Sequence, residues 1–376
     1  MIRQYSIKPY HFVLLASLIA ITVLGIIYIG SAKESTQSKQ ILGFALGMIV
    51  MLFLSMIDYS WLLHFSPVYY GAVVLLLFYV KVSGDSSHGA QRWVSIAGIQ
   101  FQPSELAKIV LILFFAWFFM MFEGRINRPG TLLLAFGLAA VPLLLILTQP
   151  DTSTTIVCIV VFAFLLFMAG LSYRIILTVA AVSLPLGIAG IIYLYANAER
   201  LINAGYYQVK RIMSWLDPSN PLYSDSASQQ QYSITAIGSG HILGKGIGNL
   251  SATSMKNTNY IMEPNTDFIF AVIGEESGFL GTMIILLLIF LIVACCLFIA
   301  SRARDLSGKL ICCGMAALIS FQSFVNLCVA TGLMPNTGVT LPFVSYGLTS
   351  LVSLYIGMGF VMNVGLQSYR TKGGFS

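Results

Sequence analysis

The stretch "FIFAVIGEESGFLGTMIILLLIFLIVACCLFIA", residues 268–300, is an apolar run long enough to cross a bilayer core of ~30 Å as one helix. Similar apolar blocks follow one another along most of the chain. The 376 residues are 57% hydrophobic and only 9% charged, whereas soluble domains carry about 25% charged residues. The sequence therefore predicts an all-α, polytopic integral membrane protein.

Glycine, proline and charged residues divide the apolar blocks into ten expected spans. The first block is too long for the core of a signal peptide and lacks a clear cleavage site, so we expect it to be retained. Residues 1–376 form one expected membrane domain with a single long loop, about 196–267. The spans are 11–30, 40–57, 67–83, 105–122, 131–148, 152–170, 174–195, 268–300, 309–333 and 343–366.

The distribution of charge predicts the orientation of the chain. An even number of spans puts both termini on one side, and that side carries ten Lys and Arg residues against five in the short loops opposite. The positive-inside rule then makes both termini cytoplasmic. Of the fourteen acidic residues only Asp58, Glu123 and Asp305 fall on that side, so the outer face is the expected working face.

The long loop has a pattern of its own. In "ERLINAGYYQVKRIMSWLDP", residues 199–218, apolar residues recur at helical spacing with Lys210 and Arg211 between them, which predicts a helix lying in the headgroup plane. The stretch "SASQQQYSITAIGSGHILGKGIGN", residues 226–249, predicts a short helix followed by glycine-rich turns.

Two patterns count against other kinds of chemistry. All six cysteines lie inside apolar blocks, so neither a disulfide framework nor a cysteine metal site is expected. The glycine-rich "GSGHILGKGIGN", residues 238–249, lacks the spacing of a nucleotide-binding phosphate loop, because Gly246 follows Lys245 where Ser or Thr is required. Lys245 either lies in a simple turn or contacts a lipid phosphate.

Residues 88–110 hold a group of polar side chains at the outer end of the fourth span. Pro103 begins a helix, and Glu105 and Lys108 are three residues apart, so they share one face of its first turn. Either they form an ion pair at the interface or they line a polar cavity. Trp93 is a membrane anchor or part of the site, and the neighbouring Arg92 has the donor geometry for a diphosphate.

Two aspartates precede spans. Asp151 in "TQPD" suits a helix cap or first-turn residue. Asp267 has the same simple explanation, but Glu275 and Glu276 follow it along the same span. A carboxyl at the mouth of a partly dry cavity acquires a raised pKa, which suits a general base. The residues alone thus predict a carboxylate-rich outer cavity with cations suited to a lipid phosphate.

These motifs resemble those of the SEDS proteins, the RodA/FtsW/SpoVE family of bacteria. The resemblance covers nearly the whole chain and includes "GAQRW", "QPSELAK", "TQPD", "MSWLDPSNP", "GSGHILGKGIG", "EPNTDFIFAVIGEESGFLG" and "MPNTGVTLPFVSYGLTSL" in family order. Two departures, Thr152-Ser153 where Leu-Gly is usual and Leu348 where glycine is usual, affect no charged position.

The resemblance implies a peptidoglycan glycosyltransferase that polymerises lipid II on the outer face. It makes Asp267 the essential residue and the expected general base, and it adds Trp93, Glu105, Lys108 and Asp151 to the site. The expected reaction inverts the anomeric carbon and releases undecaprenyl diphosphate. The negative charge of the departing diphosphate is expected to be neutralised by Arg92, Lys108 and Lys245, with or without a divalent Mg or Mn ion. No nucleotide, organic cofactor or nucleic acid is expected.

The resemblance also implies a setting: the bacterial cytoplasmic membrane, in cell elongation, division or sporulation, with a class B penicillin-binding protein as the partner transpeptidase. Two alternatives come from other classes of protein. A lipid II flippase would bind its substrate between internal repeats at the midplane, and no repeat is visible. A non-catalytic scaffold for the transpeptidase would not need the charged residues of the cavity.

Overall fold

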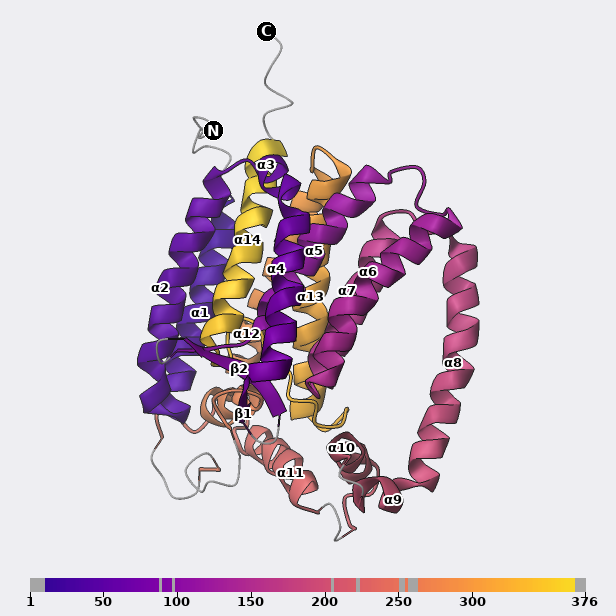
Figure 1. Cartoon of the computed structure of the whole chain (residues 1–376). Helices are drawn as coiled ribbons and strands as arrows, with labels where there is room; N and C mark the ends of the chain where they lie inside the picture. Colours follow the sequence, from indigo (N-terminus) through magenta and orange to yellow (C-terminus); the bar gives the residue numbers. More distant parts are fainter. Residues whose placement is uncertain are drawn as a thin grey trace.

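The computed structural model describes residues 11–87, 90–96, 99–203, 206–220, 224–249, 254–255 and 263–368. Within them the chain forms a helical bundle with a small sheet at one end (Figure 1). The elements are α1 (Phe12–Ala32), α2 (Glu34–Met56), α3 (Tyr59–His64), α4 (Ser66–Ser83), β1 (Asp85–Ser87), β2 (Ala90–Ile96), β3 (Ile99–Phe101), α5 (Pro103–Met121), α6 (Pro129–Thr148), α7 (Thr152–Met168), α8 (Tyr173–Ala196), α9 (Ala198–Asn203), α10 (Tyr207–Leu216), α11 (Ser224–Ser239), α12 (Ile269–Ser301), α13 (Leu306–Ala330) and α14 (Leu348–Ser368).

Each of the ten predicted spans coincides with one helix. In the described part of the chain, eight helices are long and apolar enough to cross a membrane, and α4 and α7 contain shorter apolar segments. The last span begins later than predicted. Residues 341–347 form turns instead of helix, and α14 starts at Leu348. The prediction of a polytopic all-α membrane protein is confirmed.

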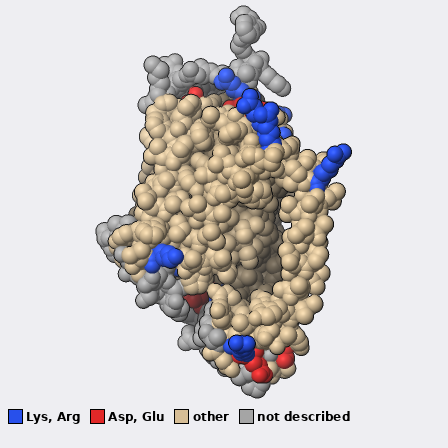
Figure 2. Space-filling model, turned by 45° about the vertical axis from the view of Figure 1, so that its right-hand side comes forward, with Lys and Arg blue, Asp and Glu red and all other residues tan. Residues whose placement is uncertain are grey.

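The two ends of the bundle differ. The start of α1, the end of α14, α3 and the α12–α13 connection lie at one end, and the sheet with α9, α10 and α11 lies at the other (Figure 1). Figure 2 shows most charged side chains of its face gathered toward these two ends. Between them large apolar side chains are exposed, including Leu75 at 70%, Leu133 at 77% and Phe290 at 72%, as expected where a helix faces lipid.

The interior of the bundle is built by α5, α13 and α14. Most of their residues are buried, and they pack on one another as well as on α2, α7 and α12. A single large apolar cluster runs through these helices. In contrast, α8 has no buried residue, packs against α9, and stands apart from the bundle (Figure 1).

The small sheet was not predicted. Strands β1, β2 and β3 are antiparallel neighbours in that order, and Val94 pairs with Phe101. The sheet carries Arg92 and Trp93, and Pro103 then opens α5 at its first turn, as predicted. The sheet therefore brings the first group of polar residues to the start of α5.

A kink in α12 accommodates the glycine-rich turns of the long loop. Gly278 has φ +61°, which favours glycine, and a side chain there would meet the backbone of Ile242 and Gly244 within 2.7 Å. The backbone N–H groups of Lys245 and Gly246 donate to the carbonyls of Glu275 and Glu276 at 2.9 Å. Residues 240–249 are thus packed onto α12 and are not a free turn.

The predicted amphipathic helix of the long loop is present as α9 and α10. Val209 and Met213 are buried against Ala198, with Leu194 at the end of α8 packed on the same cluster. On another side of α10, the Trp215 indole N–H donates to the carbonyl of Gly332 at 2.9 Å. Helix α10 therefore bridges the end of α8 and the bundle.

Candidate active site

Asp267 lies in a turn that two other segments hold in place. Asn326 of α13 donates from its amide to the carbonyls of both Asp267 and Val339, at 2.8 and 2.7 Å. Ser345 donates to the carbonyl of Thr266 at 2.7 Å. The N–H of Tyr346 donates to the carbonyl of Asn265 at 2.8 Å. The Asp267 backbone is therefore fixed by α13 and by the segment between α13 and α14.

The side chain of Asp267 does not serve as a helix cap. The N-cap position of α12 is Phe268, and no side chain caps this helix among the described residues. By contrast, Asp151 accepts from the N–H of Thr154 at 3.2 Å and caps α7. The capping explanation thus holds for Asp151 and fails for Asp267.

Charges from four parts of the chain act on Asp267. Burial raises the pKa of its carboxyl to about 6, and the Arg211 guanidinium opposes that rise. Glu263 raises the pKa further, Arg92 lowers it and Asp151 raises it, in decreasing order of effect. A carboxyl with a pKa of about 6 is largely ionised at neutral pH and basic enough to accept a proton from a hydroxyl.

Arg92 and Asp151 meet, a contact that the sequence did not predict, since the expected outer cluster joined Arg92 and Trp93 to Glu105 and Lys108. The Nη1 of Arg92 lies 3.9 Å from Oδ1 of Asp151, and its Nε donates to the carbonyl of Gln149 at 3.0 Å. Gln102 and Ser104 donate to the other carboxylate oxygen of Asp151, each at 3.3 Å. The Arg92 side chain remains 32% exposed, so it is accessible to a ligand.

Glu105 and Lys108 form the predicted ion pair, at 2.9 Å, but it is inside the bundle. Lys108 is 5% exposed and also donates to Oε1 of Gln322 at 3.1 Å. Gln322 in turn donates to the carbonyl of Thr340 at 3.0 Å. The pair therefore connects α5 to α13 and to the segment that precedes α14, and Lys108 does not extend outward.

Lys245 is engaged away from Asp267. Its ammonium lies 2.7 Å from Oε1 of Glu275, which also accepts from the N–H of Met255 at 2.9 Å. Glu276 accepts from the hydroxyl of Ser31 and from the N–H of Gly248. Both glutamates are 1% exposed, and neither is among the groups that shift the pKa of Asp267. They hold the glycine-rich turns against α12, a contact that spacing along one helix could not reveal.

Trp93 follows Arg92 on β2 and is half-buried. Successive residues of a strand point to opposite faces, so the indole and the Arg92 guanidinium leave the strand on different sides. The structure thus brings Arg92, Asp151 and Asp267 into one electrostatic group. Trp93, the Glu105–Lys108 pair and Lys245 lie outside that group.

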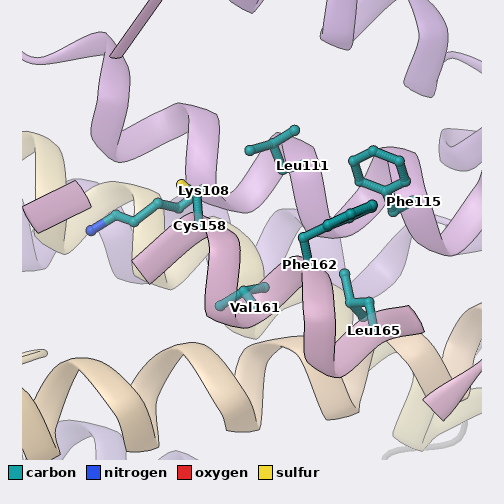
Figure 3. Close-up of a pocket in the computed structure, with 7 residues that line it drawn as sticks. All are labelled: Lys108, Leu111, Phe115, Cys158, Val161, Phe162 and Leu165. Carbon is teal, nitrogen blue, oxygen red and sulfur yellow. The ribbon is translucent and has the colours of Figure 1, made fainter. Parts of the chain in front are cut away.

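A small pocket between α5 and α7 is a separate feature. It is lined by the stem of Lys108 and by apolar residues of both helices, and the ammonium group points away from them (Figure 3). It contains no carboxylate, so it is not the place where a hydroxyl would be deprotonated. The apolar lining residues are Leu111, Phe115, Cys158, Val161, Phe162 and Leu165.

The described residues gather no group of three His, Cys, Asp or Glu side chains placed to hold a metal ion. A cage made by protein side chains alone does not fit this part of the chain.

Sequence reasoning missed four residues that shape this site. Asn326 and Gln322 lie on α13 amid apolar residues, and a polar amide within a span was the signal that could have singled them out. Gly338 has φ +74°, and a side chain there would lie 3.2 Å from Oδ2 of Asp267 and 3.5 Å from Nη1 of Arg211. Arg211 was placed on the amphipathic helix, and only the fold brings it to Asp267.

The chain is similar over nearly its whole length to known proteins. A family model described as cell cycle protein, for FtsW, RodA and SpoVE, matches residues 6–370. The chain is similar to the probable peptidoglycan glycosyltransferase FtsW of Geobacter sulfurreducens, with 32% identity covering 98% of this chain and 97% of the relative. It is also similar to the peptidoglycan glycosyltransferase MrdB of Escherichia coli, with 34% identity covering 96% and 94%.

Solved structures agree. One chain, from work on the structural coordination of polymerization and crosslinking by a peptidoglycan synthase complex, has a TM-score of 0.77 and 32% identity, and the match covers 96% of this chain and 99% of that one. The rod shape determining protein RodA of Thermus thermophilus has a TM-score of 0.69 and 29% identity, covering 96% and 98%.

Proposed function

The chain belongs to the FtsW, RodA and SpoVE family of cell cycle proteins, and from this membership we propose that it is a peptidoglycan glycosyltransferase acting on lipid II. The match covers 97% and 94% of the two glycosyltransferases named above, so this chain spans nearly the whole length of each.

The mechanism rests on one observation: Asp267 is a half-buried carboxylate that caps no helix and has a pKa raised to about 6. The acceptor's GlcNAc 4-hydroxyl must lose a proton as it attacks the anomeric carbon of the donor. Asp267 takes that proton, a contribution of typically ~10²–10⁴-fold in rate. Attack opposite the diphosphate inverts the anomeric carbon, so no covalent intermediate on the protein is needed.

The departing undecaprenyl diphosphate needs cations for its developing charge. Of the three candidates, Arg92 fits best, because it is partly exposed and its charge acts on Asp267. Lys108 and Lys245 are paired with Glu105 and Glu275. For these two lysines we therefore propose mainly a role in shaping the site, and only secondarily a contact with phosphate. Asp151 orients Arg92, and Trp93 would contact the lipid or sugar from the other face of β2.

We propose a divalent ion only as one that protein carboxylates and the substrate's phosphates would hold together. Mg²⁺ is often bound by one or two carboxylates together with substrate phosphates, and such an ion would neutralise diphosphate charge. For that purpose we propose Asp151 and Glu263, the two carboxylates whose charges act on Asp267.

The protein is a multi-pass membrane protein, and we place its active end outside the cytoplasmic membrane of a bacterium. This orientation rests on the predicted excess of basic residues at the other end. Since one matching chain belongs to a peptidoglycan synthase complex that couples polymerization to crosslinking, a class B penicillin-binding protein is the proposed partner.

The proposal is tested by incubating the purified protein with lipid II in detergent, because no bilayer is present there across which lipid II could be flipped. We expect glycan strands that a muramidase degrades, with and without a partner transpeptidase compared side by side. Lipid II that stays unpolymerised in both conditions, while vesicles containing the protein translocate it, would identify a flippase. Neither activity would leave the scaffold alternative.

A further inference from the structure

Arg211 is the strongest opposite charge acting on Asp267, yet it comes from a different part of the fold. Asp267 is held by α13, whereas Arg211 lies on α10 of the long loop. A methyl group on Gly338 would approach Oδ2 of Asp267 at 3.2 Å and Nη1 of Arg211 at 3.5 Å. We call this meeting point of Asp267, Arg211 and Gly338 the Gly338 junction.

The spacing at the junction decides what Arg211 can do. The two charged atoms lie no further apart than the sum of those two distances, roughly 7 Å. Inverting glycosidases hold the two carboxyl groups that act on opposite faces of the sugar roughly 6.5–9.5 Å apart. Arg211 lies near or below the short end of that range, which is the separation expected of a group beside the base.

Helix α10 holds Arg211 in place through contacts on two of its sides. Arg211 and Trp215 are four residues apart and so share one face of the helix. Trp215 fixes that face to the bundle through the carbonyl of Gly332. Val209 and Met213 attach the helix to α9 and the end of α8. The position of Arg211 thus depends on how the long loop is seated, while Asp267 is fixed by the bundle.

We propose that Arg211 is a positioning residue that keeps the Asp267 carboxylate ionised for proton abstraction across the Gly338 junction. This inference rests on the proposed glycosyltransferase function. It makes the long loop part of the catalytic apparatus: only when α10 is seated does the base meet its counter-charge.

The groups facing Asp267 define the expected pH dependence. Arg211 and Arg92 favour its ionised form, while Glu263, Asp151 and burial oppose it. In the wild type, turnover should fall as the pH drops through about 6, because the protonated carboxyl accepts no proton. Without Arg211 the midpoint should move upward by about one pH unit, since an opposite charge at this range lowers a carboxyl pKa by about that much or more.

The experiment compares Arg211→Gln, Arg211→Lys and the matched control Lys210→Gln, which removes a charge from the neighbouring position of α10. Glycan synthesis is measured from about pH 5 to about pH 8. In parallel, a carbodiimide that reacts with protonated carboxyls is applied over the same range, and mass spectrometry measures labelling of Asp267, with Asp267→Asn as the blank. This second readout does not require activity.

For Arg211→Gln we expect both midpoints to rise by about one unit, with turnover about threefold lower at pH 6.5 and recovering at alkaline pH. Arg211→Lys should restore most of the wild-type profile, and Lys210→Gln should match the wild type.

Unchanged midpoints in Arg211→Gln overturn the proposal. So does a higher KM for lipid II at an unchanged midpoint, which would make Arg211 a diphosphate ligand. A loss at every pH with a lower melting temperature and no rescue by Lys would make it purely structural. If the wild type makes no glycan, the proposed function fails, and the labelling midpoints still decide the role of Arg211.

Discussion

Asp267 differs physically from the other aspartates that stand before helices. Asp58, Asp151 and Asp305 each accept a backbone N–H from the first turn that follows them. Asp267 has a helix directly after it and does not cap it. Its carboxylate is instead kept in a mostly dry setting among opposing charges, and its pKa is raised for that reason. Such an arrangement contributes little to folding and suits proton transfer.

We expect Asp267→Asn to abolish polymerisation, a loss of at least about 10²-fold, because an amide accepts no proton at neutral pH. The melting temperature should not fall, since the substitution removes no cap. Asp305→Ala serves as the contrasting control. It removes the cap of α13, which costs about 1 kcal/mol, together with the hydrogen bond from the buried Tyr59 hydroxyl, and should lower stability while turnover per folded molecule persists. Glycan synthesis by Asp267→Asn at the wild-type rate would contradict the assignment of the base.

Gly338 allows a second test at this scale, because the chain contains a glycine with nearly the same backbone angle. Gly338 has φ +74° and Gly124 has φ +75°, so alanine strains both to a similar extent. Only at Gly338 does the added methyl meet Asp267 and Arg211, since nothing lies within 4 Å of the methyl at Gly124. Gly338→Ala should therefore reduce turnover at least about tenfold beyond Gly124→Ala at equal loss of stability. Equal turnover in the two variants would show that the junction needs no open space.

The residues of the site were predictable to different degrees. Asp267, Arg92, Asp151, Glu105 and Lys108 stand out because charges are rare near spans and their motifs are specific. Arg211 could not be singled out, since a cation on an amphipathic helix normally faces headgroups, and only the seating of α10 turns it inward. Lys245 illustrates the reverse case: its setting in a glycine-rich turn indicated exposure, and the kink at Gly278 instead brings it to Glu275.

At the scale of elements, the N-terminal part of α12 and the turns at 240–249 form one unit. The Lys245–Glu275 pair and four backbone hydrogen bonds join them, and Gly278 makes room for the approach. We expect Lys245→Met to destabilise the protein by about 2–3 kcal/mol, since it leaves a buried carboxylate uncompensated. This figure is below that of a fully buried pair because Lys245 is 24% exposed.

Glu275→Gln should cost less, because the remaining Lys245 reaches water, and the double variant should recover much of the loss. Melting temperatures of the four proteins form a double-mutant cycle that measures the coupling. A negligible coupling energy would contradict the role of the pair in holding the turns. Turnover that stays low in the stabilised double variant would assign Lys245 to the diphosphate instead.

The spans were predictable because each is an apolar run of bilayer length, and that physical requirement is independent of tertiary contacts. The sheet at 85–101 was not, since its strands are short, and β1 and β3 have three residues each. The turns at 341–347 were assigned to a span because they are apolar. They depart from helix because Ser345 and Tyr346 bond to the turn that holds Asp267.

For the whole molecule, the two ends have different tasks. The end with α3 and the α12–α13 connection is closed by structural contacts, such as those of Asn363 with the carbonyls of Ser55 and Ile57 and of Tyr59 with Asp305. The opposite end gathers Asp267, Arg92, Asp151 and Arg211. An enzyme that uses a lipid-linked sugar at the cell surface needs the second end outside, and this orientation was inferred from the excess of basic residues at the first.

Site-directed cysteines test that orientation directly. Glu123 lies in an exposed connection at the first end, and Ser219 lies in the exposed part of the long loop at the second. The six native cysteines lie in helices, five of them buried, so the unaltered chain should react little and provides the background. In intact cells a membrane-impermeant maleimide should label Ser219→Cys and leave Glu123→Cys unlabelled until the membrane is permeabilised. Reversed labelling would put Asp267 in the cytoplasm, where polymerised glycan could not reach the wall, and the proposed function would have to be abandoned together with the orientation.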